Sequence, residues 1–480
     1  MMANTLTIGG VPEGFDADII LRQMQRDERP LMHIARDDKR LAAFAEAVRF
    51  FAPDMPVIRF PAWDCLPYDR VSPNADISAQ RMATLAGLVH GMPKQFILLT
   101  TLNAAMQRVP ARQVLRDAAF RAEVGRPIDE EALRSFLGRM GFSKAPTVLE
   151  PGDYAIRGGI IDIYPPGDLG PIRLDLFGDI LDGARRFDPV SQRTTETLSE
   201  IELSPVSEVI LDEAAITRFR QNYRSEFGAA RSDDPLYESI SAGQKVQGFE
   251  HWLPFFHARL ESLFDYLPEV CVSFDDQLEP ARLARWEGIE DQYETRKLAM
   301  QAKQRMESVY KPVMPTTLYL DDAAWAASLN GHKVLKLHPL AQASGPGVID
   351  AQGRMGRNFA PERQQETVSL FSALCHHIQK KLASGPVVLA SYSDGSCERL
   401  SGLVSDEGFG DPVKINTRAQ IGDAGLYVTV WGLEHGFETP DFTVISEQDI
   451  LGDRLVLSLI HISEPTRQAE ISYAVFCVKK

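Results

Sequence analysis

The sequence is poor in cysteine and in long apolar runs, and each shortage excludes a class of protein. Its five cysteines in 480 residues are odd in number and scattered, which indicates reduced thiols and no disulfide framework. Apolar runs such as 96–99 fall far short of the roughly 20 residues that cross a bilayer. The chain also begins without a basic segment followed by an apolar one, so we expect no export signal and a cytoplasmic location.

Net positive charge is also missing. Acidic residues outnumber basic ones, 66 against 51, and the formal net charge is −15. A surface of this kind does not bind nucleic acid through a general basic coat, so any nucleic-acid role has to be local or indirect. The composition is otherwise that of an ordinary folded protein, with 44% apolar and 24% charged residues. At roughly 150 residues per domain, the length predicts about three compact units.

A phosphate-binding loop is a further absence, because no Gly-rich segment ends in Lys-Ser or Lys-Thr. The best-placed candidate, GGVPEGF at 9–15, has neither lysine nor hydroxyl, and its Pro12 removes a backbone N–H donor. We interpret it as a loop leading into a helix. Thr100 and Thr101 end a predicted strand, and we interpret their hydroxyls as helix caps. The sequence therefore predicts no site for nucleotide hydrolysis.

No other catalytic or metal-ligating set stands out. Cys375, His376 and His377 are adjacent on a predicted helix, point in different directions and have no second ligand cluster at zinc spacing. Ser391 and Ser393 lie in a Gly-containing turn without the pattern of a nucleophile elbow. We therefore name no catalytic, cofactor-binding or metal-binding residue.

The order of predicted elements indicates an α/β fold class with a multidomain layout. In the first part, helices and strands alternate, which is typical of a parallel sheet covered by helices; they are predicted at 39–51, 56–60, 78–90 and 96–100. We expect Asp76 or Ser78 to cap the third of these elements. After a helix at 131–140, the pattern changes to short runs of period two that are broken by Pro and Gly, which indicates a separate β-rich module.

Helices return after about residue 206, and the longest is predicted from 278 to about 307. Gly, Pro and Arg are concentrated in 346–365, which predicts a linker. A helix at 370–382 and strands at 387–392 and 426–431 then predict a last compact α/β unit. The final stretch, 457–480, reads like a translated sequencing adapter, so we leave it out of the fold and expect the native sequence to run on from Val456 in a longer protein.

Two aromatic groups could serve a partner or simply pack. Trp63 and Tyr68 lie in FPAWDCLPYDRVSP, a stiff connection in which we favour packing over display. In the long helix, Leu283, Trp286 and Tyr293 follow helical spacing, and acidic residues cancel the arginines between them. We interpret this helix as amphipathic and solvated, not as a nucleic-acid-binding element.

The β-rich module carries the most informative pattern. In IRLDLF, alternation places the aliphatic side chains in the core and Arg173, Asp175 and Phe177 on the outer face. Antiparallel pairing can bring Arg157 to the same patch. Arginine and aromatic side chains dominate protein–protein hot spots. The alternative is that both arginines pair with Asp162 and Asp175 across strands while Phe177 folds over the core, and chemistry alone leaves this open.

Five strings together resemble the bacterial transcription-repair coupling factor family, Mfd. They occur in the expected order between about residue 25 and Val456, and they are FPAWDCLPYDRVSPNADISAQRMATL, TTLNAAMQRVP, GDYAIRGGIIDIYPPG, IRLDLFGDILDGARRFDPVSQRT and SEQDILGDR. The resemblance implies a first domain similar to UvrB, the excision-repair helicase-like protein, that has lost nucleotide binding. It also implies the following layout: a split UvrB-like domain at 1–120 and 206–345, an inserted β-rich module at 121–205, a linker at 346–365, a small third α/β domain at 366–456, and a non-native tail at 457–480.

By the same resemblance, the inserted module binds UvrA through Arg157, Arg173 and Phe177. Leu176 stands where some relatives have a second phenylalanine, and it falls on the predicted core face. Complete family members continue into an RNA polymerase-interaction domain and a translocase that uses ATP and magnesium to move on double-stranded DNA.

We therefore expect the present chain to be a non-enzymatic, monomeric fragment that recruits UvrA to stalled RNA polymerase in nucleotide excision repair. In the family, a far C-terminal domain masks the recruitment surface, so the resemblance implies constant exposure here. A free-standing ATPase or helicase of the UvrB class is the alternative, and the absent phosphate loop disfavours it.

Overall fold

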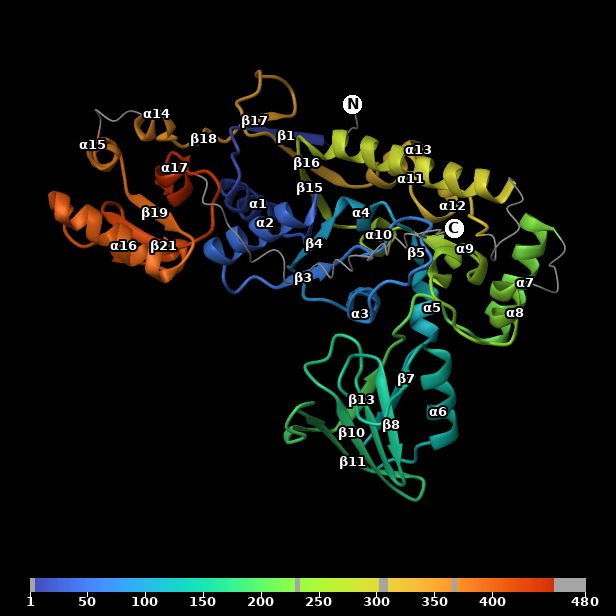
Figure 1. Cartoon of the computed structure of the whole chain (residues 1–480). Coiled ribbons are helices and arrows are strands. Elements are labelled where there is room, and N and C mark those ends of the chain that lie inside the picture. The colour runs from blue at the N-terminus through green and yellow to red at the C-terminus, as the bar shows by residue number, and fades with distance from the viewer. Residues whose placement is uncertain (1–4, 229–233, 302–309, 365–368, 453–480) are drawn as a thin grey trace, which may run out of the picture. The chain divides into compact units, whose positions relative to one another are not determined.

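A computed structural model of the chain describes residues 5–228, 234–301, 310–364 and 369–452 (Figure 1). The chain divides into two compact units, one comprising 1–354 and 417–419 and the other comprising 355–416 and 420–480. Within the described stretches, no helix combines the length and the apolar character that crossing a membrane requires. The expectations for the stretch 457–480, Cys477 included, lie outside the described residues.

The first unit is built on a seven-stranded sheet, which confirms the predicted α/β class. Every neighbouring pair of strands in it is parallel. The order across the sheet is β17 (Val348–Asp350), β1 (Thr5–Gly9), β16 (Lys333–Leu337), β15 (Cys271–Asp275), β2 (Leu31–Ala35), β4 (Ile97–Thr101) and β3 (Val57–Phe60). The sheet thus combines strands from both sides of the β-rich module. Its inner strands β2 and β4 are buried at every position, as strands covered on both faces must be.

Two of the helices beside this sheet begin with capping side chains. Helix α2 (Asp38–Phe51) is capped by Asp37, whose carboxylate accepts a hydrogen bond from the Arg40 N–H. Helix α3 (Ala75–His90) begins earlier than predicted because Asn74 caps it, so the expectation of Asp76 or Ser78 is wrong. The loop at 9–15 leads into helix α1 (Phe15–Asp27), as predicted.

The predicted capping by threonine is also wrong. Thr101 precedes the short helix α4 (Leu102–Ala105), but its hydroxyl makes no capping hydrogen bond. The Thr100 hydroxyl donates instead to the carbonyl oxygen of Phe60 at 2.8 Å, on the neighbouring strand β3. Both hydroxyls are buried in the sheet, so their surroundings are set by tertiary packing.

The β-rich module contains a six-stranded sheet packed on one helix (Figure 1, cyan to green). The order is β12 (Thr194–Leu198), β11 (Ile180–Phe187), β10 (Ile172–Phe177), β9 (Ile160–Ile163), β8 (Asp153–Arg157) and β7 (Ser143–Lys144), antiparallel except between β7 and β8. Helix α6 (Glu130–Arg139) buries Leu133, Phe136 and Leu137 against the inner face of the sheet. A ribbon of β6 (Phe120–Glu123) and β13 (Glu200–Leu203) joins the two ends of the module.

Helices predominate in the rest of the first unit. They include α5 (Arg112–Asp117), α7 (Glu213–Phe227), α8 (Pro235–Ser241), α9 (Leu253–Phe256), α10 (Leu263–Tyr266), α11 (Leu278–Gln301), α12 (Pro315–Leu318) and α13 (Asp322–Leu329), with a short ribbon of β5 (Val109–Pro110) and β14 (Leu260–Glu261). In α11, Trp286 and Tyr293 pack on the core as predicted. Leu283 does not, because it is 47% exposed. The predicted end of this helix, at 302–307, lies outside the described residues.

The segment 346–365 has more structure than a linker. Strand β17 pairs with β1 at the edge of the large sheet. Strand β18 (Arg354–Met355) belongs to the sheet of the second unit, and helix α14 (Ala360–Arg363) follows it. The Gly and Pro content predicts a flexible connection, but backbone pairing with β1 places 348–350 in a sheet.

The second unit is a smaller α/β structure, as predicted. Its sheet has the order β18, β22 (Phe437–Glu438), β23 (Thr443–Ser446), β19 (Val387–Ser391), β21 (Leu426–Val430) and β20 (Val413–Lys414). Helices α15 (Leu370–Leu382), α16 (Asp394–Val404) and α17 (Glu447–Leu451) belong to the same unit, and apolar side chains from all three enter its core.

Candidate protein-docking surface

Two adjacent hairpins carry the three side chains singled out by the sequence. Strands β8 and β9 are joined by Gly158–Gly159, and strands β10 and β11 are joined by Gly178–Asp179. Gly158 and Gly178 have φ values of +62° and +64° at the first central position of each turn, a conformation that glycine adopts without strain. The Leu176 N–H donates to the Gly159 carbonyl at 2.7 Å and joins the two hairpins near their turns.

Strand register places Arg157 and Arg173 on the same face of this sheet. Arg157 pairs with Ile160, which pairs in turn with Asp175, and Arg173 pairs with Asp162. Side chains of paired residues point to the same side, and positions two apart along a strand share a face. The opposite face is the core of the module, where Ile161 and Leu174 are completely buried. Arg157 and Arg173 therefore share the outer face of the sheet.

Phe177 points away from the core and is 78% exposed. It pairs with Ile180, which is 40% exposed, and lies diagonally from Ile160, which is 39% exposed. The alternative in which the Phe177 ring folds over the core is wrong. Arg157, Ile160, Phe177 and Ile180 together form a surface at the hairpin turns that we call the tip surface.

Arg173 has a different environment, and for this residue the cross-strand alternative is correct. Its Nε and Nη2 atoms donate to the two carboxylate oxygens of Asp162 at 2.7 and 2.9 Å. Nη2 also donates to Gln192 at 3.2 Å, and the guanidinium lies 4.6 Å from the centre of the Phe187 ring. The hydrogen bond with Asp162 raises the pKa of Arg173. This arginine is tied into the sheet surface.

Asp175 and Arg157 also have contacts within the module. Asp175 pairs with Arg185 at 2.5 Å, and not with Arg157 or Arg173, the two arginines of the cross-strand alternative. Arg157 is exposed and donates to the carbonyl oxygen of Pro146. Within the described stretches no carboxylate lies within ion-pair distance of it. Arg157 is therefore the cation of this face that a partner's carboxylate can pair with.

Two residues of the tip surface were missed by the sequence analysis. Ile160 follows from the alternation of IIDI, which places positions 160 and 162 outward. Ile180 does not follow so directly, because the pairing shifts between Asp175 and Leu176, where Asp182 is left opposite no partner. A one-residue bulge reverses the faces of all positions on one side of it.

At its opposite end the module is held by a buried ion pair. We call this pair and the groups around it the root. Arg81 of α3 donates to Glu208 at 2.8 Å, with side chains 0% and 2% exposed. The indole N–H of Trp63 donates to the same carboxylate at 2.7 Å. Tyr68 is completely buried. The packing interpretation of the string that contains Trp63 and Tyr68 is thus confirmed.

At the carboxyl ends of the parallel strands, where related folds bind nucleotides, charged side chains of the chain pair with one another. Arg36 pairs with Asp275 at 2.8 Å, and Arg40 pairs with the buried Asp16. A Cβ at Gly10 would lie 2.8 Å from the Asp350 carboxylate, so the loop is packed directly against its neighbours. Within the described residues no group of three or more His, Cys, Asp or Glu side chains could hold a metal ion.

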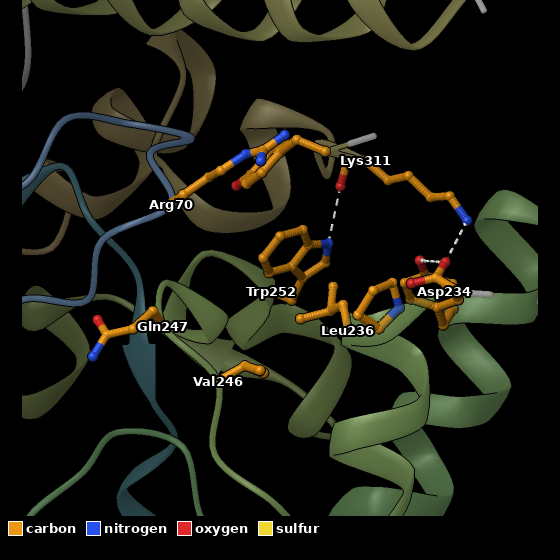
Figure 2. Close-up of a pocket in the computed structure, with 10 residues that line it drawn as sticks. Arg70, Asp234, Leu236, Val246, Gln247, Trp252 and Lys311 are labelled. Carbon is orange, nitrogen blue, oxygen red and sulfur yellow. Dashed lines mark hydrogen bonds and ion pairs between the residues drawn. The ribbon is translucent and has the colours of Figure 1, made fainter. Parts of the chain in front are cut away.

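A cavity of about 300 Å³ lies among the helices of the first unit (Figure 2). Trp252, Leu236 and Val246 contribute apolar walls. Lys311 donates to Asp234 at 2.8 Å, and its carbonyl accepts the Trp252 indole N–H at 2.9 Å. The two charges in this part of the cavity, on Lys311 and Asp234, neutralise each other. We assign it no chemistry.

Comparison with known proteins relates the β-rich module and the whole chain to described families. Residues 120–208 match the family model of the UvrB interaction domain. The transcription-repair-coupling factor of Escherichia coli is 30% identical over 92% of this chain, and that of Haemophilus influenzae is 29% identical over 93%. A relative from Myxococcus xanthus is 35% identical over 54% of the chain.

The chain spans 37% and 38% of the lengths of the first two relatives. All residues of the tip surface and the Arg173–Asp162 pair lie inside the matched domain. Along nearly its whole length, the chain thus matches the N-terminal part of the transcription-repair-coupling factors, and it carries a UvrB interaction domain at 120–208.

Proposed function

We propose that this chain recruits the damage sensor UvrA through the tip surface of its UvrB interaction domain, in transcription-coupled nucleotide excision repair. The observation that carries the proposal is a phenylalanine that is 78% exposed beside an arginine without a carboxylate partner in the described stretches. The match to the domain model and the printed names of the relatives support the process.

The physical role follows from the cost of an exposed aromatic ring in water. Burying the Phe177 ring in a recess of the partner removes apolar area from solvent, which is worth roughly 25 cal/mol per Å². Arg157 can form charge-assisted hydrogen bonds with a carboxylate of the partner, which orient the docked surface. Docking of this kind requires no reaction chemistry, so the chain acts here as a binding protein.

The domain layout that we propose follows the sequence expectation with one change. A UvrB-like domain at 1–120 and 206–345 is interrupted by the UvrA-binding module at 121–205, and a third domain occupies 366–456. The seven-stranded sheet, which uses strands from both flanks of the module, supports this layout. Because β17 extends that sheet to Asp350, we place the connection between the domains after this residue. Contact with RNA polymerase and ATP-driven movement on DNA are not assigned to any described residue.

The test is calorimetric titration of the chain with purified UvrA. We expect Phe177→Ala to weaken binding by about 2 kcal/mol or more, close to thirtyfold, as truncation of a central hot-spot residue does. Arg157→Glu should weaken it as well, because it replaces an attraction by a repulsion. Leu169→Ala is the matched control, since Leu169 is 91% exposed in the same module but lies outside the tip surface. Unchanged affinity in both tip variants would overturn the proposal.

A further inference from the structure

The Arg173–Asp162 pair differs from the tip surface beside it because its polar groups already form hydrogen bonds within the module. The Asp162 side chain is only 4% exposed, and both of its oxygens receive hydrogen bonds from the Arg173 guanidinium. The planar fork of an arginine matches a carboxylate in this two-point geometry. If Arg173 turned toward a docking partner, it would leave a buried carboxylate without compensation, which is strongly unfavourable.

The contacts of Arg173 also join three strands. Asp162 lies on β9, Arg173 on β10, and Phe187 at the end of β11, with Gln192 in the turn that follows. The same three strands carry the apolar residues of the tip surface: Ile160 on β9, Phe177 on β10 and Ile180 on β11. The pair therefore fixes the relative positions of the side chains that face solvent.

The tip surface itself is mostly apolar. Diagonal neighbours on a sheet lie about 7–8 Å apart, which is within reach of an aromatic ring. Ile160 and Ile180 thus extend the surface around Phe177, each with about two fifths of its area exposed. Asp175 and Arg185 neutralise each other next to this patch, so Arg157 is the positive charge of the tip surface that remains for a partner's carboxylate.

We infer that Arg173 is a positioning residue that acts through Asp162, and that Ile160 and Ile180 join Phe177 and Arg157 as the groups that touch UvrA. The inference rests on the proposed function and specifies the partner surface: an apolar recess wide enough for three side chains, with one carboxylate at its edge opposite Arg157. A surface with two carboxylates placed for two arginines would not match this arrangement.

Asp162→Asn is the decisive variant, measured by calorimetric titration with UvrA. If Arg173 only positions the tip, this change at a nearly inaccessible residue should weaken binding about tenfold, because the tie between β9 and β10 is loosened. If Arg173 instead contacts a carboxylate of UvrA directly, the variant frees it, and affinity should stay the same or increase. That second result would overturn the inference.

Two further measurements separate positioning from general loss of structure. The double variant Asp162→Asn with Arg173→Gln should bind no more weakly than either single variant, since both remove the same tie. Arg157→Gln should reduce the salt dependence of the affinity, whereas Arg173→Gln should lower the affinity and leave the salt dependence unchanged. Near-ultraviolet circular dichroism identifies any variant that has not folded. In place of such a variant we measure Arg173→Lys, which keeps the positive charge and should retain part of the affinity for UvrA.

The added apolar contacts have their own test. Ile160→Ser and Ile180→Ser should each weaken UvrA binding by roughly fivefold. Val190→Ser is the control, because Val190 is 87% exposed in the same module and lies outside the tip surface. Full affinity in both isoleucine variants would remove them from the contact. If Phe177→Ala and Arg157→Glu also bind normally, the proposed function fails; if they bind weakly, only the further inference fails.

Discussion

The tip of the UvrB interaction domain and the root, where this domain meets β3 and α3, use the same side-chain types in opposite ways. At the root, the Arg81 guanidinium lies 4.3 Å from the centre of the Phe60 ring, and both residues are completely buried. At the tip, Arg157 and Phe177 are both exposed. Arginine and phenylalanine thus stabilise the fold in one place and are offered to solvent in the other. The difference lies in how many hydrogen bonds, ion pairs and apolar contacts these side chains already make within the chain.

The polar groups of the root have almost all of their hydrogen-bond partners within the chain. Arg81 donates to both oxygens of Glu208, at 2.8 and 3.3 Å, and to the Pro61 carbonyl at 2.8 Å. The His257 ring lies 2.8 Å from the Glu208 carbonyl oxygen. A buried ion pair is tolerated only with such a set of hydrogen bonds, and removal of one partner leaves the other charge stranded. The charged groups of the root are therefore buried and paired, and are not available to bind a partner.

The largest expected effect is at the root. Arg81→Met should lower the free energy of unfolding by about 3–5 kcal/mol, because Glu208 remains buried without its counter-charge. Urea denaturation followed by circular dichroism measures the loss. Arg185→Met is the matched control, since the exposed Asp175–Arg185 pair should contribute no more than about 0.5 kcal/mol. Equal losses in the two variants would abolish the distinction between root and tip.

A second carboxyl group beside the root should make stability depend on pH. Burial raises the pKa of Glu250 to about 7, and the neighbouring Glu208 contributes in the same direction. The native state therefore favours the protonated form, whose stabilisation is complete below about pH 4.5, the ordinary value, and is lost as the pH rises through 7. Glu250→Gln should accordingly be more stable than the parent at pH 8, by about 2–3 kcal/mol.

The measurement is the midpoint of urea denaturation across pH 4.5–8. The amide keeps an acceptor for the Ser72 hydroxyl, which donates to Glu250 at 2.7 Å. The parent should lose stability steadily across this range, and the variant should lose less. Glu398→Gln, at an exposed position of α16, should leave the pH profile of the parent unchanged. A variant whose profile follows that of the parent would contradict the assignment to Glu250.

The smallest expected effect is at the tip. Phe177→Ala should change the free energy of unfolding by less than about 0.5 kcal/mol, because the ring has few contacts to lose. Phe60→Ala should cost about 3–5 kcal/mol, since it leaves a cavity beneath Arg81. Both variants are compared in the same denaturation experiment. A large loss of stability in Phe177→Ala would show that the ring supports the fold, and would assign it to packing.

Much of the fold could be predicted from local patterns. Helix α15 matches its predicted range, and α2 differs from its own by one residue, because apolar residues at helical spacing and an N-terminal cap mark both. Strand β17 could not be predicted, since its composition is that of a linker and its hydrogen bonds come from β1, far away in the sequence. The start of α3 depended on which of Asn74, Asp76 and Ser78 accepts a hydrogen bond from a backbone N–H, and in the structure it is Asn74.

The candidate site divides in the same way. The alternation of IRLDLF was enough to turn Phe177 outward, because successive side chains of a strand must point to opposite faces. The ion-pair partners on this face could not be predicted, because the sequence contains several oppositely charged candidates. The structure pairs Arg173 with Asp162 and Asp175 with Arg185. The bulge at Asp182 likewise decided where Ile180 points.

Strand alternation alone was enough to place Arg173, Asp175 and Phe177 on the outer face of the module, and the missing lysine loop led the sequence to predict no phosphate-binding loop in the first domain. The tertiary structure decided which charged groups on that face are already paired, and so which of them can meet a partner. The reason is physical: alternation is a property of one strand, whereas an ion pair depends on the register between strands and on the burial of both groups.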